Sequence, residues 1–122
     1  MNEEDREIFL TAEEVLKLPE EVKKAIIKRI PERWHIIREA TLRLITTGKS
    51  PTNAELEAYA RQVWRKPYTP WFLLKVRWTM AGIETELVRR AKDHIDFSYY
   101  RLKGVRIKES ELNALLSKSK GN

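Results

Sequence analysis

The sequence predicts an all-α fold, a small single-domain bundle of five or six helices that spans residues 1–122. The 122-residue chain contains only four glycines, about half of what average usage would supply, so it has little material for the tight turns of a sandwich or barrel. Apolar residues recur at helical spacing in several segments, and prolines and capping residues separate those segments. The terminal stretches 1–10 and 117–122 are expected to fray.

The N-terminal segment combines acidic residues with a helix start signal. The acids of residues 1–10 suit a short helical turn, because negative charge favours the N-terminal end of a helix dipole. Thr11 and Glu14 have the spacing of a capping box, and Pro19 either stops the short helix that follows or opens the next one. The sequence therefore predicts a short helix between Thr11 and Pro19.

Three further helices are predicted before the middle of the chain. The first carries an apolar stripe formed by Val22, Ile26 and Ile30. Pro31 opens the second and Gly48 closes it, and its stripe consists of Ile37, Thr41, Leu44 and Ile45. Thr52 and Glu55 form a second capping box, followed by the inward-facing residues Leu56, Tyr59, Ala60 and Val63.

The longest predicted helix covers residues 71–95, after the KPYTP segment 66–70, which its prolines keep non-helical. One stripe is predicted to face the core: Phe72, Val76, Met80, Ile83, Leu87 and Ala91. A second stripe is aromatic at its start and basic along its length: Trp71, Lys75, Trp78, Gly82, Thr85, Arg89 and Lys92. We interpret the second stripe as a binding face, on which Gly82 lets a ligand or another backbone approach, although each tryptophan taken singly also suits the core.

The C-terminal region is predicted to contain a loop and a last helix. Gly104 is expected to make a turn, and the alternation around Val105 and Ile107 suits extended backbone. An amphipathic helix begins near Ser110, with Leu112, Leu115 and Leu116 on one side.

Positive charge is concentrated in the middle of the chain. The net charge of +6 divides into −2 for residues 1–60, +8 for residues 61–108 and 0 for residues 109–122. The middle segment also holds eight of the eleven aromatic residues. This composition indicates a partner with negative charge and flat apolar faces, and nucleic acid is the first candidate. Because Lys and Arg neutralise phosphates and aromatic rings stack on unpaired bases, the interleaved pattern favours single-stranded DNA.

The candidate site residues follow from this chemistry. The predicted stacking residues are Tyr68, Trp71, Trp78, Tyr99 and Tyr100. The predicted phosphate-binding residues are Lys66, Lys75, Arg77, Arg89, Arg90, Lys92, Arg101, Lys103 and Arg106. We predict no catalytic residues and no protein metal site.

Other functional classes find little support in the sequence. TGKSP, residues 47–51, lacks the first glycine of a phosphate-binding loop, because Arg43 stands there. DHID, residues 93–96, is more typical of capping and solvated groups than of a metal site. No run of 18 or more apolar residues and no apolar leader is present, so we expect a cytoplasmic protein without a membrane partner. With no cysteine, disulfides and thiolate sites are excluded.

Several segments, taken together, resemble a known domain. The order EEVLKLPEEVKKAIIKRIPERW, the KPYTPW break, the long helix and the YYRLKGVRIKES tail are similar to the helix-bundle accessory domain of primase-polymerases from crenarchaeal plasmids. The resemblance covers most of the chain and implies a domain that recognises the single-stranded DNA template and binds ATP or another nucleoside triphosphate, with Mg²⁺ on its phosphates. It also implies that the polymerase carboxylates lie in a separate catalytic primase-polymerase domain, which would be a partner.

Two alternatives share the same composition. A helix-turn-helix-like regulator of double-stranded DNA would have the same basic charge, but it would prefer duplex over single strands and would act as a dimer on two half-sites. A protein-interaction bundle would use Trp71 and Trp78 as hot spots against an acidic partner.

Overall fold

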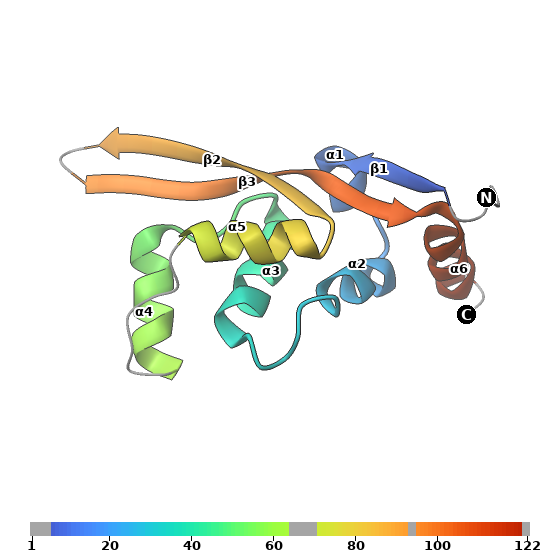
Figure 1. Ribbon diagram of the computed structural model, residues 1–122, viewed down its shortest axis with the longest axis horizontal. Coiled ribbons are helices and arrows are strands. Elements are labelled where there is room, and N and C mark those ends of the chain that lie inside the picture. Colours follow the sequence, from blue (N-terminus) through green and yellow to red (C-terminus); the bar gives the residue numbers. More distant parts are fainter. Residues whose placement is uncertain (1–5, 64–70, 93–94, 121–122) are drawn as a thin grey trace.

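The computed structural model describes residues 6–63, 71–92 and 95–120. Within these ranges the chain folds as a three-stranded antiparallel sheet packed against helices (Figure 1). The fold is therefore mixed α/β, and the prediction of an all-α bundle is wrong. No described helix is both long and apolar enough to cross a lipid bilayer.

The helices of the first half lie close to where the sequence predicted them. In chain order the elements are β1 (Glu7–Thr11), α1 (Ala12–Leu16), α2 (Glu20–Ile27), α3 (His35–Thr47), α4 (Asn53–Val63), α5 (Trp71–Met80), β2 (Ile83–Lys92), β3 (Ile95–Lys108) and α6 (Glu109–Lys120). Both predicted capping boxes are formed, at Thr11 with Glu14 and at Thr52 with Glu55. Gly48 ends α3 in the left-handed conformation, with φ at 81°. The start of α3 differs from the prediction, since it begins at His35 and not at Pro31.

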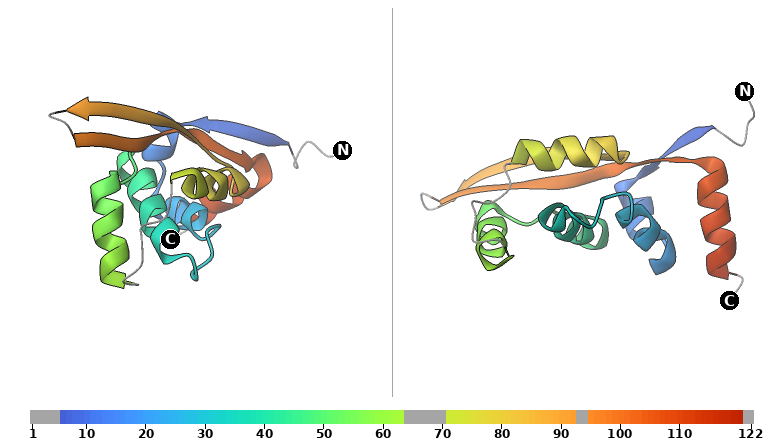
Figure 2. Two further views of the ribbon diagram at one scale, coloured as in Figure 1. Left: turned by 60° about the vertical axis from the view of Figure 1, so that its left-hand side comes forward. Right: turned by 60° about the horizontal axis from the view of Figure 1, so that its bottom comes forward.

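The sheet has the strand order β1-β3-β2, so β3 is central and pairs with both neighbours. Its β2–β3 part is a long hairpin that reaches past α4 and α5 (Figures 1 and 2). Helices α3, α4 and α5 pack against the sheet, and α2 packs against α3 and α6 (Figure 1). β1 occupies residues 7–11, where the sequence predicted a frayed helical turn.

Burial along β3 identifies the two faces of the sheet. Tyr100, Leu102, Val105 and Ile107 are buried against the helices. The alternation skips one position because the register against β2 shifts beside Lys103, as in a β-bulge. Arg101, Lys103 and Arg106 alternate with them and are exposed on the opposite side. We call this opposite side the outer face.

Gly104 lies inside β3, so the turn predicted there is wrong. A Cβ atom at this position would lie 2.1 Å from the Leu10 carbonyl oxygen and 2.4 Å from Cζ of Phe9. The glycine is needed because β1 and the Phe9 ring approach the backbone too closely for any side chain.

The helix predicted over 71–95 ends at Met80, and its second half is the strand β2. Gly82 forms the connection with φ at 80°. Its carbonyl accepts the Arg106 backbone N–H at 2.7 Å, and a Cβ atom on Gly82 would lie 2.8 Å from the Arg106 carbonyl oxygen. The close approach predicted at Gly82 therefore occurs, but it is made by the backbone of β3.

The faces of α5 are opposite to the predicted ones. Leu74 and Trp78 are fully buried in the core shared by α3 and the sheet. Phe72, Val76 and Met80, which were predicted to face the core, are 64%, 48% and 70% exposed. We call these three residues the apolar row of α5.

Candidate nucleic-acid interface

The predicted aromatic stripe is largely part of the hydrophobic core. Trp78 is fully buried, and its Nε1–H donates to Oγ1 of Thr41 at 2.7 Å. Tyr100 is also buried, with edge-on contacts to the rings of Trp71 at 5.0 Å and Trp78 at 5.4 Å. Burial raises the pKa of the Tyr100 hydroxyl, and the charge of Arg89 acts in the opposite direction. Trp78 and Tyr100 therefore cannot stack on bases, and Trp71 is half-buried beside the Tyr100 ring.

Tyr99 is the predicted stacking residue that the structure places on the outer face. It is half-buried, and the Lys49 ammonium lies 5.9 Å from its ring centroid. Tyr68 and Lys66 lie outside the described residues. Arg90 and Lys92 are in β2, opposite Phe97 and Ile95, and their side chains also fall outside the described part.

The predicted cations of β3 are paired with carboxylates on the outer face. Arg101 pairs with Glu86, which also lies 3.9 Å from the Lys103 ammonium. Arg106 donates to Glu84 at 2.6 Å, and this hydrogen bond raises the pKa of the guanidinium. Surface pairs of this kind contribute little to stability, but they neutralise much of the charge that a phosphate would meet.

A second group of predicted cations lies on the helix side of the molecule. Lys75 and Arg89 are exposed, and Arg77 is half-buried with its guanidinium 4.0 Å from the ring centroid of Trp34. Within the described ranges, none of these three has a carboxylate at ion-pair distance. By strand alternation Arg89 shares a face with Thr85 and Leu87, the face that packs on the helices. The predicted basic stripe is thus divided between two sides of the sheet.

Helices α4 and α5 cross at a steep angle in all three views (Figures 1 and 2). Both pack against α3 or the sheet. The segment between α3 and α4 is hydrogen-bonded to the sheet. The backbones of Lys49 and Arg101 form an isolated antiparallel β-bridge, and the Ser50 N–H donates to the Tyr100 carbonyl at 2.8 Å. Helix α5 is followed directly by the β2–β3 hairpin.

The exposed side of α5 was missed by the sequence analysis. The apolar row runs along this side, and Lys75 and Thr79 lie beside it, also exposed. A signal was available, because a helix with apolar residues around its whole circumference is normally covered on all sides. On this short helix, the row is an apolar surface that the protein leaves exposed.

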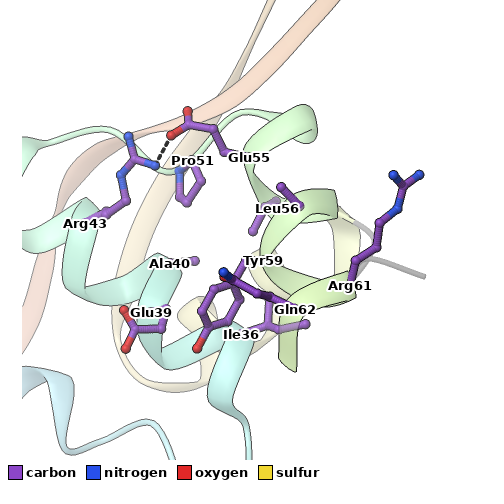
Figure 3. A pocket seen from close by; sticks show the side chains of 11 residues that line it. Ile36, Glu39, Ala40, Arg43, Pro51, Glu55, Leu56, Tyr59, Arg61 and Gln62 are labelled. Atoms are coloured by element: carbon purple, nitrogen blue, oxygen red, sulfur yellow. Dashed lines mark hydrogen bonds and ion pairs between the residues drawn. The ribbon is translucent and has the colours of Figure 1, made fainter. Parts of the chain in front are cut away.

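A pocket of about 640 Å³ lies between α3 and α4 (Figure 3). Its floor is apolar, with Ile36, Ala40 and Leu56, and its rim carries both signs of charge (Figure 3). Arg43 pairs with Glu55 across the rim, and Arg61 pairs with Glu57. A triphosphate needs a surplus of cations, so this balanced pocket does not suit the predicted ATP.

Within the described residues, no three His, Cys, Asp or Glu side chains lie close enough together to hold a metal ion. The DHID segment, 93–96, falls partly outside those residues. Comparisons with protein-family models, with curated proteins and with solved structures found no match.

Proposed function

We propose that this chain binds double-stranded DNA through α5 and the hairpin β2–β3. The observation that carries the proposal is the way α5 is held: Trp78 fixes one side of the helix to the core, and the other side is exposed. The major groove of B-DNA is wide enough for one α-helix, and a helix held in this way can enter it.

The charge around α5 supports a phosphate-rich partner. Residues 61–82 contain five basic residues and no acidic one. Of the three that the structure describes, Arg61 pairs with Glu57 and Arg77 lies over the Trp34 ring. Lys75 is exposed on α5 and Arg89 is exposed on the hairpin. Arg89 pairs with Ser98 in the hairpin, and its charge acts on the hydroxyl of Tyr100, whose ring contacts Trp71 and Trp78 of α5. Arg89 is therefore available to contact the phosphate backbone beside a groove that holds α5.

Single-stranded template recognition has weaker support. Its predicted stacking residues Trp78 and Tyr100 are in the core. On the outer face, Tyr99 is the remaining stacking candidate, and the cations Arg101 and Arg106 on the same face already pair with carboxylates. The helix bundle that the primase-polymerase resemblance implies is not the fold of this chain. A role in priming, the binding of a nucleoside triphosphate and a catalytic partner domain stay predictions that rest on the order of the sequence motifs alone.

Removing single cations is expected to change the salt dependence of binding. The logarithm of the association constant for a short fluorescent duplex should fall linearly with the logarithm of the salt concentration. Lys75→Ala and Arg89→Ala should each weaken binding and reduce the magnitude of the slope by about 1, since each removes one phosphate contact. Fluorescence anisotropy at several salt concentrations measures both quantities.

Lys17→Ala provides the matched control for this experiment. Lys17 is an exposed cation far from α5 in the sequence, and it pairs with Glu13. Its removal lowers the net charge by the same amount but should leave the slope unchanged. Equal effects of Lys17→Ala and Arg89→Ala, or no binding of duplex at low salt, would contradict the proposal.

A further inference from the structure

The exposed side of α5 offers few hydrogen-bonding groups. The apolar row occupies its centre, with Phe72, Val76 and Met80 spaced one helical turn apart. On one flank, the Thr79 hydroxyl donates to the Lys75 carbonyl at 2.8 Å. On the other flank, the Arg77 guanidinium lies over the Trp34 ring, with Nη1 3.8 Å from Sδ of Met80. The Thr79 hydroxyl and the Arg77 guanidinium are therefore engaged within the protein, and the exposed Lys75 ammonium is left to contact a partner.

The floor of the major groove has one apolar group that such a row can contact. Each A·T pair presents the C5-methyl group of thymine, and the other groups that distinguish base pairs there are hydrogen-bond donors and acceptors. An apolar side chain facing a G·C pair would leave those donors and acceptors without water and without partners. The row thus complements thymine methyl groups and is poorly matched to G·C pairs.

We propose that the apolar row of α5 recognises thymine methyl groups in the major groove, so that the chain prefers T-rich duplex sites. This inference rests on the proposed function. Duplex DNA is favoured over a protein as the covering partner because the row is flanked by the exposed Lys75, with the Arg77 guanidinium on its other flank, and α5 itself contains no acidic residue. An acidic macromolecule with apolar groups recessed between two charged strands fits this pattern.

The test compares duplexes that differ only in methyl groups. A T-rich duplex is titrated beside the same duplex with every thymine replaced by uracil, which lacks the C5-methyl group. Burial of each methyl group favours binding about fourfold, so two or three contacts predict roughly 15- to 60-fold tighter binding of the thymine duplex. A G·C duplex with 5-methylcytosine should likewise bind more tightly than its unmethylated form.

Substitutions in the apolar row test whether these residues cause the preference for thymine over uracil. In the triple variant Phe72→Ala, Val76→Ala and Met80→Ala, the thymine and uracil duplexes should bind equally. Lys75→Ala serves as the matched control, because it should weaken both duplexes by the same factor and preserve their ratio. All three row residues are at least 48% exposed, so the triple variant should keep its fold, which circular dichroism and a thermal melt would check.

The other outcomes separate the two proposals. Equal binding of thymine and uracil duplexes by the unmodified protein would overturn the inference and leave duplex binding intact. Absence of binding to any duplex would overturn both. If sedimentation shows a dimer that the triple variant converts to a monomer without altering the thymine preference, the row is a contact between two copies of the chain and the inference is wrong.

Discussion

Replacement of Trp78 by alanine is expected to lower the free energy of unfolding by about 3–5 kcal/mol. The Trp78 side chain is fully buried between α3, α5 and the sheet, and its ring contacts the Tyr100 ring edge-on at 5.4 Å. The substitution would leave a large cavity and remove the hydrogen bond that Nε1 donates to Thr41 at 2.7 Å. Urea denaturation followed by circular dichroism measures the change. Since small domains are stabilised by only about 5–15 kcal/mol, the variant should be close to unfolding at physiological temperature.

Phe72→Ala and Met80→Ala are the matched controls for Trp78→Ala. Both residues are on the same helix, and their side chains are 64% and 70% exposed. Each substitution should therefore change the free energy of unfolding by about 0.5 kcal/mol or less. The opposite order, with Phe72→Ala more destabilising than Trp78→Ala, would show that α5 packs through the face originally predicted from the sequence, and the account of α5 would be wrong.

Replacement of Arg29 by alanine is expected to destabilise the protein by about 1–3 kcal/mol. Arg29, which follows α2, joins that helix to the α5–β2 connection, to β3 and to α6. Its Nη1 donates to the carbonyls of Ala81 and Arg106 at 3.2 and 3.1 Å, and its Nη2 contacts both carboxylate oxygens of Glu111 at 2.9 Å. Without it, two backbone carbonyls and one carboxylate lose their partner beside the connection from α5 to β2. Thermal and urea unfolding measure the loss.

Lys28→Ala and Arg29→Lys distinguish this network from a general charge effect. Lys28 is the exposed neighbour of Arg29, and its removal should be nearly neutral. Lysine at position 29 keeps the charge but cannot reproduce the planar fork, so most of the loss should remain. Full stability of Arg29→Lys would indicate that charge alone is required and would contradict the structural role assigned to the guanidinium.

Local signals in the sequence were sufficient for the helices of the first half. A capping box depends on two residues three positions apart, and the side chains of Thr52 and Glu55 make the hydrogen bonds that their spacing predicted. The same is true of Gly48, whose positive φ ends α3. These features are set by neighbours in the chain, so no knowledge of the tertiary fold was needed.

The strand β2 was predicted as helix because its apolar spacing is ambiguous. Ile83 and Leu87 are four positions apart, and residues at this spacing share a face in a strand as well as in a helix. Alternation was present, since Ile83, Thr85 and Leu87 point to the core and Glu84 and Glu86 do not. Gly82 marked the boundary, but it was interpreted as part of the helix.

That error also reversed the faces of α5. A helix that continued to residue 95 would connect Phe72, Val76 and Met80 to Ile83 and Leu87 in one apolar stripe. Once the helix ends at Met80, that continuity disappears, and the stripe with the larger tryptophan side chains is buried. Two apolar sides on a ten-residue helix cannot be distinguished without knowing what each side packs against.

The position of Gly104 could not be predicted from local sequence for a different reason. Glycine is needed at position 104 because Phe9 and Leu10 lie against its backbone. These two residues are almost a hundred positions earlier in the chain, and they approach Gly104 only when β1 pairs with β3. The bulge beside Lys103 also shifts the alternation, which makes the strand hard to recognise.

The distribution of charge along the sequence located the basic region, but it did not show on which side of the sheet each cation lies. The concentration of positive charge in residues 61–108 is a property of composition. The separation of Lys75 and Arg89 from Arg101 and Arg106 depends on the hairpin, which places the two groups on opposite sides of a sheet. The carboxylates of Glu84 and Glu86, which neutralise the second group, come from the paired strand.

Competition between duplex and single-stranded DNA tests the central claim most directly. A fluorescent duplex bound to the protein is challenged with unlabelled duplex, or with either of its separate strands, at the same nucleotide concentration and salt. Binding through α5 in the major groove predicts that unlabelled duplex displaces the probe at much lower concentration than either strand. More efficient displacement by a single strand would contradict this account and would favour a template-binding surface on the outer face of the sheet.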